Sequence, residues 1–269
     1  MTRIVNNCVA LVCLCLFWGQ SLRAADASHS EQIKWGNESV FNEEHNTLGL
    51  FSGVLGGQIV LAGGTSDDYS RWGRNAVCLS ENAGFALYED VLSKPLAYGA
   101  SITLSDGILC IGGRDSSQCY EDVFFVTMQQ GKLNVSEDWP PLPFPLSNAA
   151  GALLDNKVYL FGGRKSVSPS RLSDSFFVLD LSNKSRGWKE LPGYPGCVRE
   201  DAILVVQNNG VSPCLYLLGG QTETEEGLSS CLTDGYVYNP QLGKWSSLGS
   251  DFPKGICAAV ASGANHILL

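Results

Sequence analysis

The chain has 269 residues, of which 44% are hydrophobic and 17% charged, so it carries enough apolar material for a sizeable core and too little charge for a disordered protein. A net charge of −9 excludes a general nucleic-acid binder, which needs a basic face for phosphates. The three histidines, His29, His45 and His266, are scattered, which disfavours a histidine-rich metal site and a Ser-His-Asp triad.

Residues 1–27 have the features of a secretory signal peptide. Arg3 provides a positive charge, Val9–Trp18 is an apolar run too short to span a bilayer comfortably, and Ala25–Ala27 fits an A-x-A cleavage site. We therefore expect a secreted or periplasmic protein that keeps no membrane contact after cleavage. The alternative is a retained anchor.

A repeat of about 50 residues dominates the remaining chain. Each unit has an apolar run that ends in a Gly-Gly doublet, and in three units a tryptophan follows about 25 residues later. The runs are Ile59–Gly64, Ile108–Gly113, Val158–Gly163 and Leu215–Gly220, and the tryptophans are Trp139, Trp188 and Trp245.

This pattern predicts an all-β protein in which four-stranded sheets, or blades, are arranged radially as a β-propeller. Small residues suit the innermost strands, and the tryptophans would fill the wedges between sheets. A β-sandwich with chance glycine pairs is the alternative. The predicted blades are 48–92, 97–142, 148–191 and 201–248, followed by a partial blade at 255–269 and preceded by an outer strand of the last blade at 32–41.

Two segments, Lys94–Gly113 (KPLAYGASITLSDGILCIGG) and Leu142–Gly163 (LPFPLSNAAGALLDNKVYLFGG), resemble the cyclically permuted mutarotase family, which is similar to the N-acetylneuraminate epimerases. The resemblance implies a kelch-type propeller of six blades, of which this chain would hold about four complete blades and partial ones, as a C-terminally truncated form. It also implies an isomerase that interconverts the anomers of a carboxylated, sialic acid-like sugar without a metal or a cofactor, provided that the missing blades are present. The family's Gly-Glu…Arg motif is absent from this sequence, so we assign no catalytic residue.

In a propeller, the loops that lead into the inner strands and those that follow the doublets line the axial mouth. Arginines there could clamp a sugar carboxylate through both oxygens, although they could equally form structural ion pairs between blades. The candidate substrate-binding residues are Tyr98, Asn148, Arg199, Glu200 and Asp201 from the first set of loops, and Arg114, Arg164 and Gln221 from the second, where Asp115 also lies.

Three aspartates, Asp122, Asp174 and Asp234, stand before the third strand of their repeats, and this recurrence favours a turn or capping role over catalysis. A copper oxidase of the galactose oxidase type is disfavoured, because it would need two histidine ligands. The remaining alternative is a non-catalytic kelch propeller that binds a glycan or a protein.

Seven cysteines follow residue 27. Disulfides Cys110–Cys119 and Cys214–Cys231 are possible, while Cys110, Cys214 and Cys257 are expected to pack as small hydrophobic residues. The incomplete ring predicts open strand edges near Ile33–Val40 and Ile256–Leu269, through which the chain could associate with itself.

Overall fold

The computed structural model describes residues 48–80, 84–224, 226–252, 260–262 and 266–268. The predicted signal peptide, the outer strand at 32–41 and the edge at Ile33–Val40 lie outside these residues, as does most of the edge at Ile256–Leu269. Within the described residues, no helix has both the length and the apolar character needed to cross a membrane.

Four antiparallel sheets of four strands each form the body of the molecule, and we number them blades 1 to 4 in chain order. Blade 1 comprises β1 (Phe51–Leu55), β2 (Gln58–Ala62), β3 (Ala76–Ser80) and β4 (Gly84–Tyr88). Blade 2 comprises β5 (Ala100–Thr103), β6 (Ile108–Ile111), β7 (Val123–Gln129) and β8 (Lys132–Ser136). Blade 3 comprises β9 (Ala150–Leu154), β10 (Lys157–Phe161), β13 (Phe176–Asp180) and β14 (Lys189–Glu190). Blade 4 comprises β15 (Ile203–Asn208), β16 (Pro213–Leu218), β19 (Gly235–Asn239) and β20 (Lys244–Gly249).

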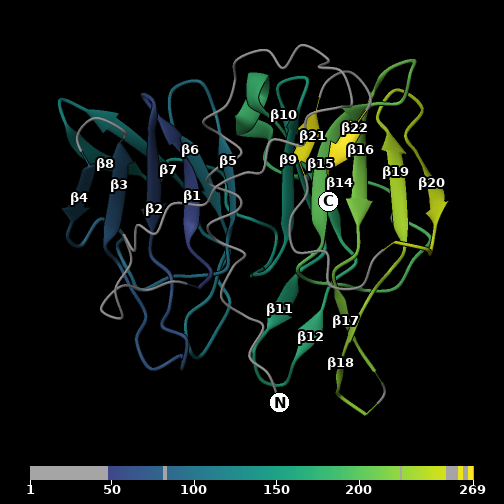
Figure 1. Ribbon diagram of the computed structural model, residues 1–269, viewed down its shortest axis with the longest axis horizontal. Coiled ribbons are helices and arrows are strands. Elements are labelled where there is room, and N and C mark those ends of the chain that lie inside the picture. Colours follow the sequence, from purple (N-terminus) through teal and green to yellow (C-terminus); the bar gives the residue numbers. More distant parts are fainter. Residues whose placement is uncertain (1–47, 81–83, 225, 253–259, 263–265, 269) are drawn as a thin grey trace, which may run out of the picture.

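The blades are arranged as a β-propeller. Their first strands β1, β5, β9 and β15 lie near the middle of the molecule, while β4 and β20 lie at its two outer sides (Figure 1). The first three sheets lie between residues 48–92, 97–142 and 148–191, and the fourth ends at Gly249, one residue beyond the limit given for 201–248. In the region predicted as a partial blade, β21 (Val260–Ser262) and β22 (His266–Leu268) pair as an antiparallel hairpin, with β21 beside β15.

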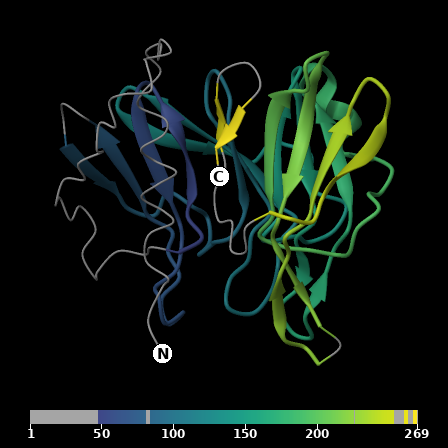
Figure 2. The ribbon, with the colours of Figure 1, turned by 45° about the vertical axis from the view of Figure 1, so that its right-hand side comes forward.

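Two additional ribbons extend the loops that follow the doublets of blades 3 and 4. One pairs β11 (Arg164–Ser166) with β12 (Arg171–Leu172), and the other pairs β17 (Gln221–Glu223) with β18 (Ser229–Cys231). Both point to the same end of the molecule, the lower end in Figures 1 and 2. A short 3₁₀ helix, η1 (Leu181–Arg186), connects β13 to β14.

The hydrophobic core is divided into three layers, each of which lies between neighbouring blades. Alternation along the strands produces these layers, because successive side chains point to opposite faces of a sheet. As predicted, the tryptophans fill the wedges. Trp139 and Trp188 pack between blades 2 and 3, and Trp245 packs between blades 3 and 4, where its ring lies 5.0 Å from that of Phe176.

The doublets attach each blade to the next. The N–H of Gly113 donates to the carbonyl oxygen of Leu146, which precedes blade 3, at 2.8 Å. Gly112 has a φ of 63°, and a Cβ atom on it would lie 2.1 Å from the same oxygen. Only glycine combines this backbone conformation with so close an approach, which explains why the doublet recurs.

Two predictions need correction. Cys110, Cys119, Cys214 and Cys231 are free thiols, so neither of the possible disulfides forms, and Cys110 and Cys214 are buried as expected of small hydrophobic residues. The aspartates before the third strands are not turn caps throughout: Asp122 forms an ion pair with Lys94, and Asp234 forms one with Arg199. In blade 3, Ser175 rather than Asp174 accepts the doublet's backbone hydrogen bond that Asp122 and Asp234 accept in their blades.

Candidate functional site at the propeller axis

The loops that enter the inner strands have the same geometry in all four blades. In each, the residue after the doublet pairs with the residue three positions before the inner strand, and the residue that follows this partner adopts a left-handed backbone conformation. The left-handed residues are Gly49, Tyr98, Asn148 and Asp201, with φ values of 64°, 60°, 54° and 52°.

A chain of backbone hydrogen bonds connects these four residues, which we call the axial series. Tyr98 donates its N–H to the carbonyl oxygen of Gly49 at 2.7 Å, Asn148 donates to Tyr98 at 2.7 Å, and Asp201 donates to Asn148 at 3.0 Å. Three of the predicted site residues therefore stand at equivalent positions on successive blades and contact one another around the axis.

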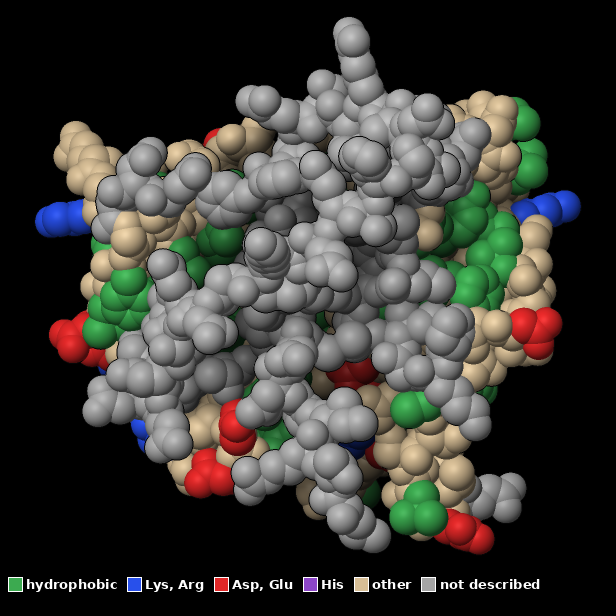
Figure 3. Space-filling view, viewed as in Figure 1, with side chains coloured by type: hydrophobic (Ala, Val, Ile, Leu, Met, Phe, Trp, Pro, Cys, Tyr) green, Lys and Arg blue, Asp and Glu red, His purple; other side chains and the backbone are tan. Residues whose placement is uncertain are grey.

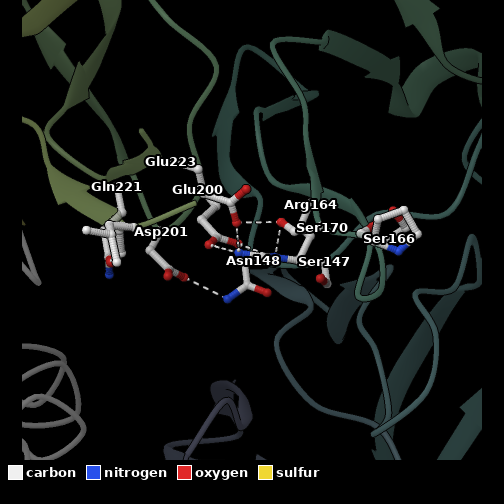
Figure 4. A network of polar contacts seen from close by, with 12 residues as sticks. Ser147, Asn148, Arg164, Ser166, Ser170, Glu200, Asp201, Gln221 and Glu223 are labelled. Carbon is white, nitrogen blue, oxygen red and sulfur yellow. Dashed lines mark hydrogen bonds and ion pairs between the residues drawn. The ribbon is translucent and has the colours of Figure 1, made fainter. Parts of the chain in front are cut away.

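Arg164 is the centre of a polar network between blades 3 and 4 (Figure 4). Its Nε donates to Glu200 Oε2 at 2.8 Å, and its Nη2 reaches Glu200 Oε1, so both carboxylate oxygens of Glu200 are bound. Nη2 also donates to Glu223 Oε1 at 3.1 Å, and Nη1 donates to Ser170 Oγ at 2.6 Å. Arg164 thus has its charge balanced by two carboxylates before any ligand arrives.

Arg114 has a different environment. Its guanidinium lies between two aromatic rings, 5.1 Å from the centroid of Trp72 and 4.6 Å from that of Tyr98. Its Nη1 donates a hydrogen bond of 3.4 Å to the backbone oxygen of Asp115, and no acidic side chain among the described residues forms an ion pair with it. Attraction to the two ring faces holds a half-buried cation in place while leaving its charge available.

Asp201 is the acidic member of the axial series. It keeps contact with solvent although protein surrounds much of its carboxyl group, and its Oδ1 accepts a hydrogen bond of 2.8 Å from Asn148 Nδ2 (Figure 4). Desolvation by the surrounding protein raises the pKa of Asp201, and the nearby charge of Glu200 adds to this rise. The Asn148 hydrogen bond and the charges of Arg164 and Arg114 oppose it.

Tyr98 lies in the same environment. Burial raises the pKa of its phenol above the ordinary value, and a hydrogen bond of 3.4 Å to the hydroxyl of Tyr69 acts in the same direction. Tyr98 is therefore a neutral hydrogen-bonding and stacking group at physiological pH. It contacts Arg114 and, through its backbone, Asn148.

The structure places Arg199 differently from the expectation that three arginines converge at the mouth. Its side chain is completely buried, and its guanidinium donates to both oxygens of Asp234 at 2.7 and 2.8 Å, to Tyr194 Oη at 2.8 Å and to the backbone oxygen of Gly219 at 2.8 Å. These bonds hold Arg199 in the interior of blade 4. The structure brings Arg114 and Arg164, but not Arg199, beside the axial series.

Gln221 and Asp115 have mainly local roles. Gln221 pairs with Glu200 through the backbone, and its side-chain oxygen accepts a hydrogen bond from Ser229 within the β17–β18 ribbon. Asp115 accepts the backbone N–H of Ser117 at 2.7 Å and the hydroxyl of Tyr120. Burial alone would raise the pKa of Asp115, but these hydrogen bonds outweigh it and lower the pKa to about 2.

Sequence reasoning missed three members of the site: Trp72, Ser170 and Glu223. Each lies in a loop that follows a doublet, and these loops differ in length between blades. The sequence offers one signal for these loops. The first residue after each doublet pairs with the loop that leads into the inner strand, so the residues that follow it lie near the axial mouth. Among the described residues, no three His, Cys, Asp or Glu side chains are grouped so that they could hold a metal ion.

A cleft of about 700 Å³ lies on the face of blade 1 that points away from blade 2. Leu50, Leu61, Val77 and Leu87 form its apolar wall, and Trp72 also lines it. In Figure 3, apolar side chains are visible at the left side of the molecule, where blade 1 lies, and at the right side, where blade 4 lies. The cleft therefore lies on a face of the blade 1 sheet, and Trp72, which also contacts Tyr98 of the axial series, lies between the two sites.

Comparisons with known proteins agree with this architecture. The family model of N-acetylneuraminate epimerase matches residues 139–269. The chain is 30% identical over 139 residues to an N-acetylneuraminate epimerase of Yersinia pestis (strain Pestoides F), an alignment that covers 50% of this chain and 33% of that protein. It is 31% identical over 131 residues to the corresponding protein of Haemophilus influenzae (strain PittEE), covering 49% and 32%.

The matched segment thus spans about a third of the length of these curated relatives. A solved structure titled "Structure of YjhT" superposes with a TM-score of 0.59, covering 75% of this chain and 70% of that one at 14% identity. This likeness concerns the fold. With the four blades, the Gly-Gly doublets and these matches, the chain is a kelch-type β-propeller that resembles the N-acetylneuraminate epimerases.

Proposed function

We propose that the axial face binds a carboxylated sugar of the sialic acid type and interconverts its anomers. The observation that carries the proposal is Arg114, a cation held between Trp72 and Tyr98 with no acidic partner among the described residues. A planar guanidinium can bind both oxygens of a carboxylate, and the flanking aromatic faces suit the apolar face of a pyranose ring. The relatives' name, N-acetylneuraminate epimerase, supports this substrate class.

Arg164 has a different role in this proposal. Because Glu200 and Glu223 already bind its guanidinium, it orders the loops of blades 3 and 4 rather than receiving the sugar's carboxylate. The substrate would lie with its carboxylate at Arg114, on the side of blades 1 and 2, and its anomeric centre toward the acidic side of the axis.

The test uses the full chain and N-acetylneuraminate. Exchange between its anomers is followed by exchange NMR, and binding is followed by titration calorimetry, for the wild type, Arg114→Gln and the control Arg186→Gln. Arg186 is an exposed arginine of η1, so its loss changes the net charge equally. Loss of a charged hydrogen-bond pair should weaken binding about 10- to 100-fold in Arg114→Gln and leave the control unchanged.

Binding without acceleration of anomer exchange would favour the second possibility, a non-catalytic propeller that recognises a glycan. Equal affinities of the wild type and Arg114→Gln would remove Arg114 as the carboxylate ligand. A neutral sugar of similar size serves as the specificity control, since it lacks the carboxylate that Arg114 would bind.

The signal-like residues 1–27 support the further proposal that the protein is secreted or periplasmic. Mass spectrometry of the mature N-terminus from fractionated cells tests it. A chain that begins after Ala24 or Ala27 is the expected result, and an uncleaved cytoplasmic chain would contradict the proposal.

A further inference from the structure

The axial series contains one acidic side chain, that of Asp201. Its other members are a glycine, a tyrosine and an asparagine, so the blades present different chemistry on the same backbone. Interconversion of sugar anomers requires a group that removes a proton from the anomeric hydroxyl. The hydrogen bonds of each carboxylate near the axis indicate which one could remove this proton.

Glu200, the neighbour of Asp201, is unsuited to this task. Arg164 binds both of its carboxylate oxygens, at 2.8 Å to Oε2 and through a second, shorter contact to Oε1. A carboxylate held in this bidentate way is stabilised in its ionised form and has no oxygen directed at a substrate. Glu223 is bound through Oε1 to the same arginine and to Ser170.

Asp201 has the opposite arrangement. Oδ1 accepts the hydrogen bond from Asn148, while Oδ2 accepts none from the described residues, and the residue keeps contact with solvent although protein surrounds much of its carboxyl group. The charged and titratable groups that influence it are Glu200, Arg164, Arg114 and Tyr98. Desolvation, with Glu200, makes Asp201 a stronger base than an ordinary aspartate.

We propose that Asp201 transfers the proton at the anomeric centre and that Asn148 positions it; this inference rests on the proposed function. The Asp201 carboxylate takes the proton of the anomeric hydroxyl as the bond between the anomeric carbon and the ring oxygen breaks. The electron pair of that bond passes to the ring oxygen, which takes a proton from water. The resulting hydroxide takes the proton from Asp201, and ring closure on the other face of the carbonyl reverses these steps.

Asn148 suits both protonation states of its neighbour. Its Nδ2 donates to the ionised carboxylate at 2.8 Å, and its amide oxygen could accept from the protonated acid after a half-turn of the amide. That oxygen is buried and accepts no hydrogen bond from the described residues. Because Asn148 contacts the carboxyl group and not the reacting atoms, it is a positioning residue.

The chain itself provides variants that preserve the backbone. Position 148 has a φ of 54°, and Gly49 stands at the same point of blade 1, so Asn148→Gly removes the amide without straining the loop. Asn156→Gly is its control, because Asn156 is also left-handed, with a φ of 57°, in the turn between β9 and β10. Asp201→Asn is compared with Asp174→Asn, the same change at an exposed aspartate before β13.

Anomer exchange and N-acetylneuraminate binding are measured for each variant between pH 4 and 8. Asp201→Asn should lower the catalysed rate by about 10²- to 10⁴-fold and retain binding, while Asp174→Asn matches the wild type. In Asn148→Gly, loss of the hydrogen bond raises the pKa of Asp201 further, so the acid limb of the rate profile moves to higher pH. Asn156→Gly should leave the profile in place.

The two proposals fail in different ways. Full activity in Asp201→Asn, or an unmoved pH profile in Asn148→Gly, would overturn the assignment of these residues while leaving the proposed function intact. A wild-type chain that binds the sugar and does not accelerate exchange would overturn both the isomerase function and the proton transfer by Asp201.

Discussion

The buried pair of Arg199 and Asp234 provides the sharpest test of how blade 4 is held together. Arg199 is fully buried, whereas the Asp234 side chain is 21% exposed. Leu96 and Leu146 occupy the position of Arg199 in blades 2 and 3, as shown by the doublet N–H that donates to each of their carbonyl oxygens. The chain therefore contains its own apolar alternative to this arginine.

The expected free energies follow from this contrast. Asp234→Asn leaves a buried guanidinium uncompensated, which costs about 3–5 kcal/mol for fully buried pairs and about 2–4 kcal/mol here, since Asp234 is partly exposed. Arg199→Leu removes the donor to the Gly219 oxygen and should cost about 1–3 kcal/mol. In the double variant no charge remains unpaired, so the total should stay near about 1–3 kcal/mol.

A double-mutant cycle should thus give a coupling energy of about 2–4 kcal/mol. Urea unfolding at pH 7, followed by tryptophan fluorescence, measures the four free energies of unfolding. The matched control is a cycle on Lys94 and Asp122, a pair whose side chains are 36% and 41% exposed and for which we expect about 0–1 kcal/mol. A coupling in the Arg199 cycle no larger than that of the control would refute the reasoning.

Three further predictions follow from the same region. Gly162 has a φ of 66°, and a Cβ atom on it would lie 2.6 Å from the oxygen of Arg199, so Gly162→Ala should lower the Tm, whereas the open Gly187 at a φ of 71° provides a milder control. Trp245 has a buried indole N–H without a partner among the described residues, so Trp245→Phe should cost far less in the free energy of unfolding than Trp245→Ala, for which we expect about 3–5 kcal/mol. Burial favours a higher pKa for Asp234, but its hydrogen bonds with Arg199 hold the pKa below the ordinary value. The stability that this pair provides is therefore present above pH 4 and is lost as the pH falls below it. In an acid titration of the free energy of unfolding, the double variant should lack this loss.

The propeller fold could be predicted because its causes are local and repeated. Gly112 and Gly113 recur in register with Trp139 and its counterparts, and each of these features has a packing role that only a few residue types can fill. The axial position of Tyr98, Asn148 and Asp201 followed from the same periodicity. The blade limits needed no knowledge of side-chain contacts.

Side-chain partners could not be predicted in this way. Arg164 directly follows a doublet and Arg199 stands two positions before Asp201, and both were predicted to line the mouth. Arg164 reaches the axis, whereas Arg199 points into the core. The difference arises from Asp234 and Tyr194, which receive Arg199, and from Glu200 and its network, which receives Arg164. Such choices depend on tertiary neighbours from loops of unequal length.

The hydrogen-bonded chain of left-handed residues at the axis has a consequence for how new chemistry could arise in this protein. Its geometry depends on the backbone alone, and glycine, tyrosine, asparagine and aspartate all satisfy it in one molecule. A substitution at position 98, 148 or 201 can therefore change the group presented at the centre and keep the backbone frame, whereas a side chain at Gly49 would collide with the ring of Tyr98. Each blade presents its axial side chain from its own backbone position. The binding surface at the centre can therefore change one blade at a time.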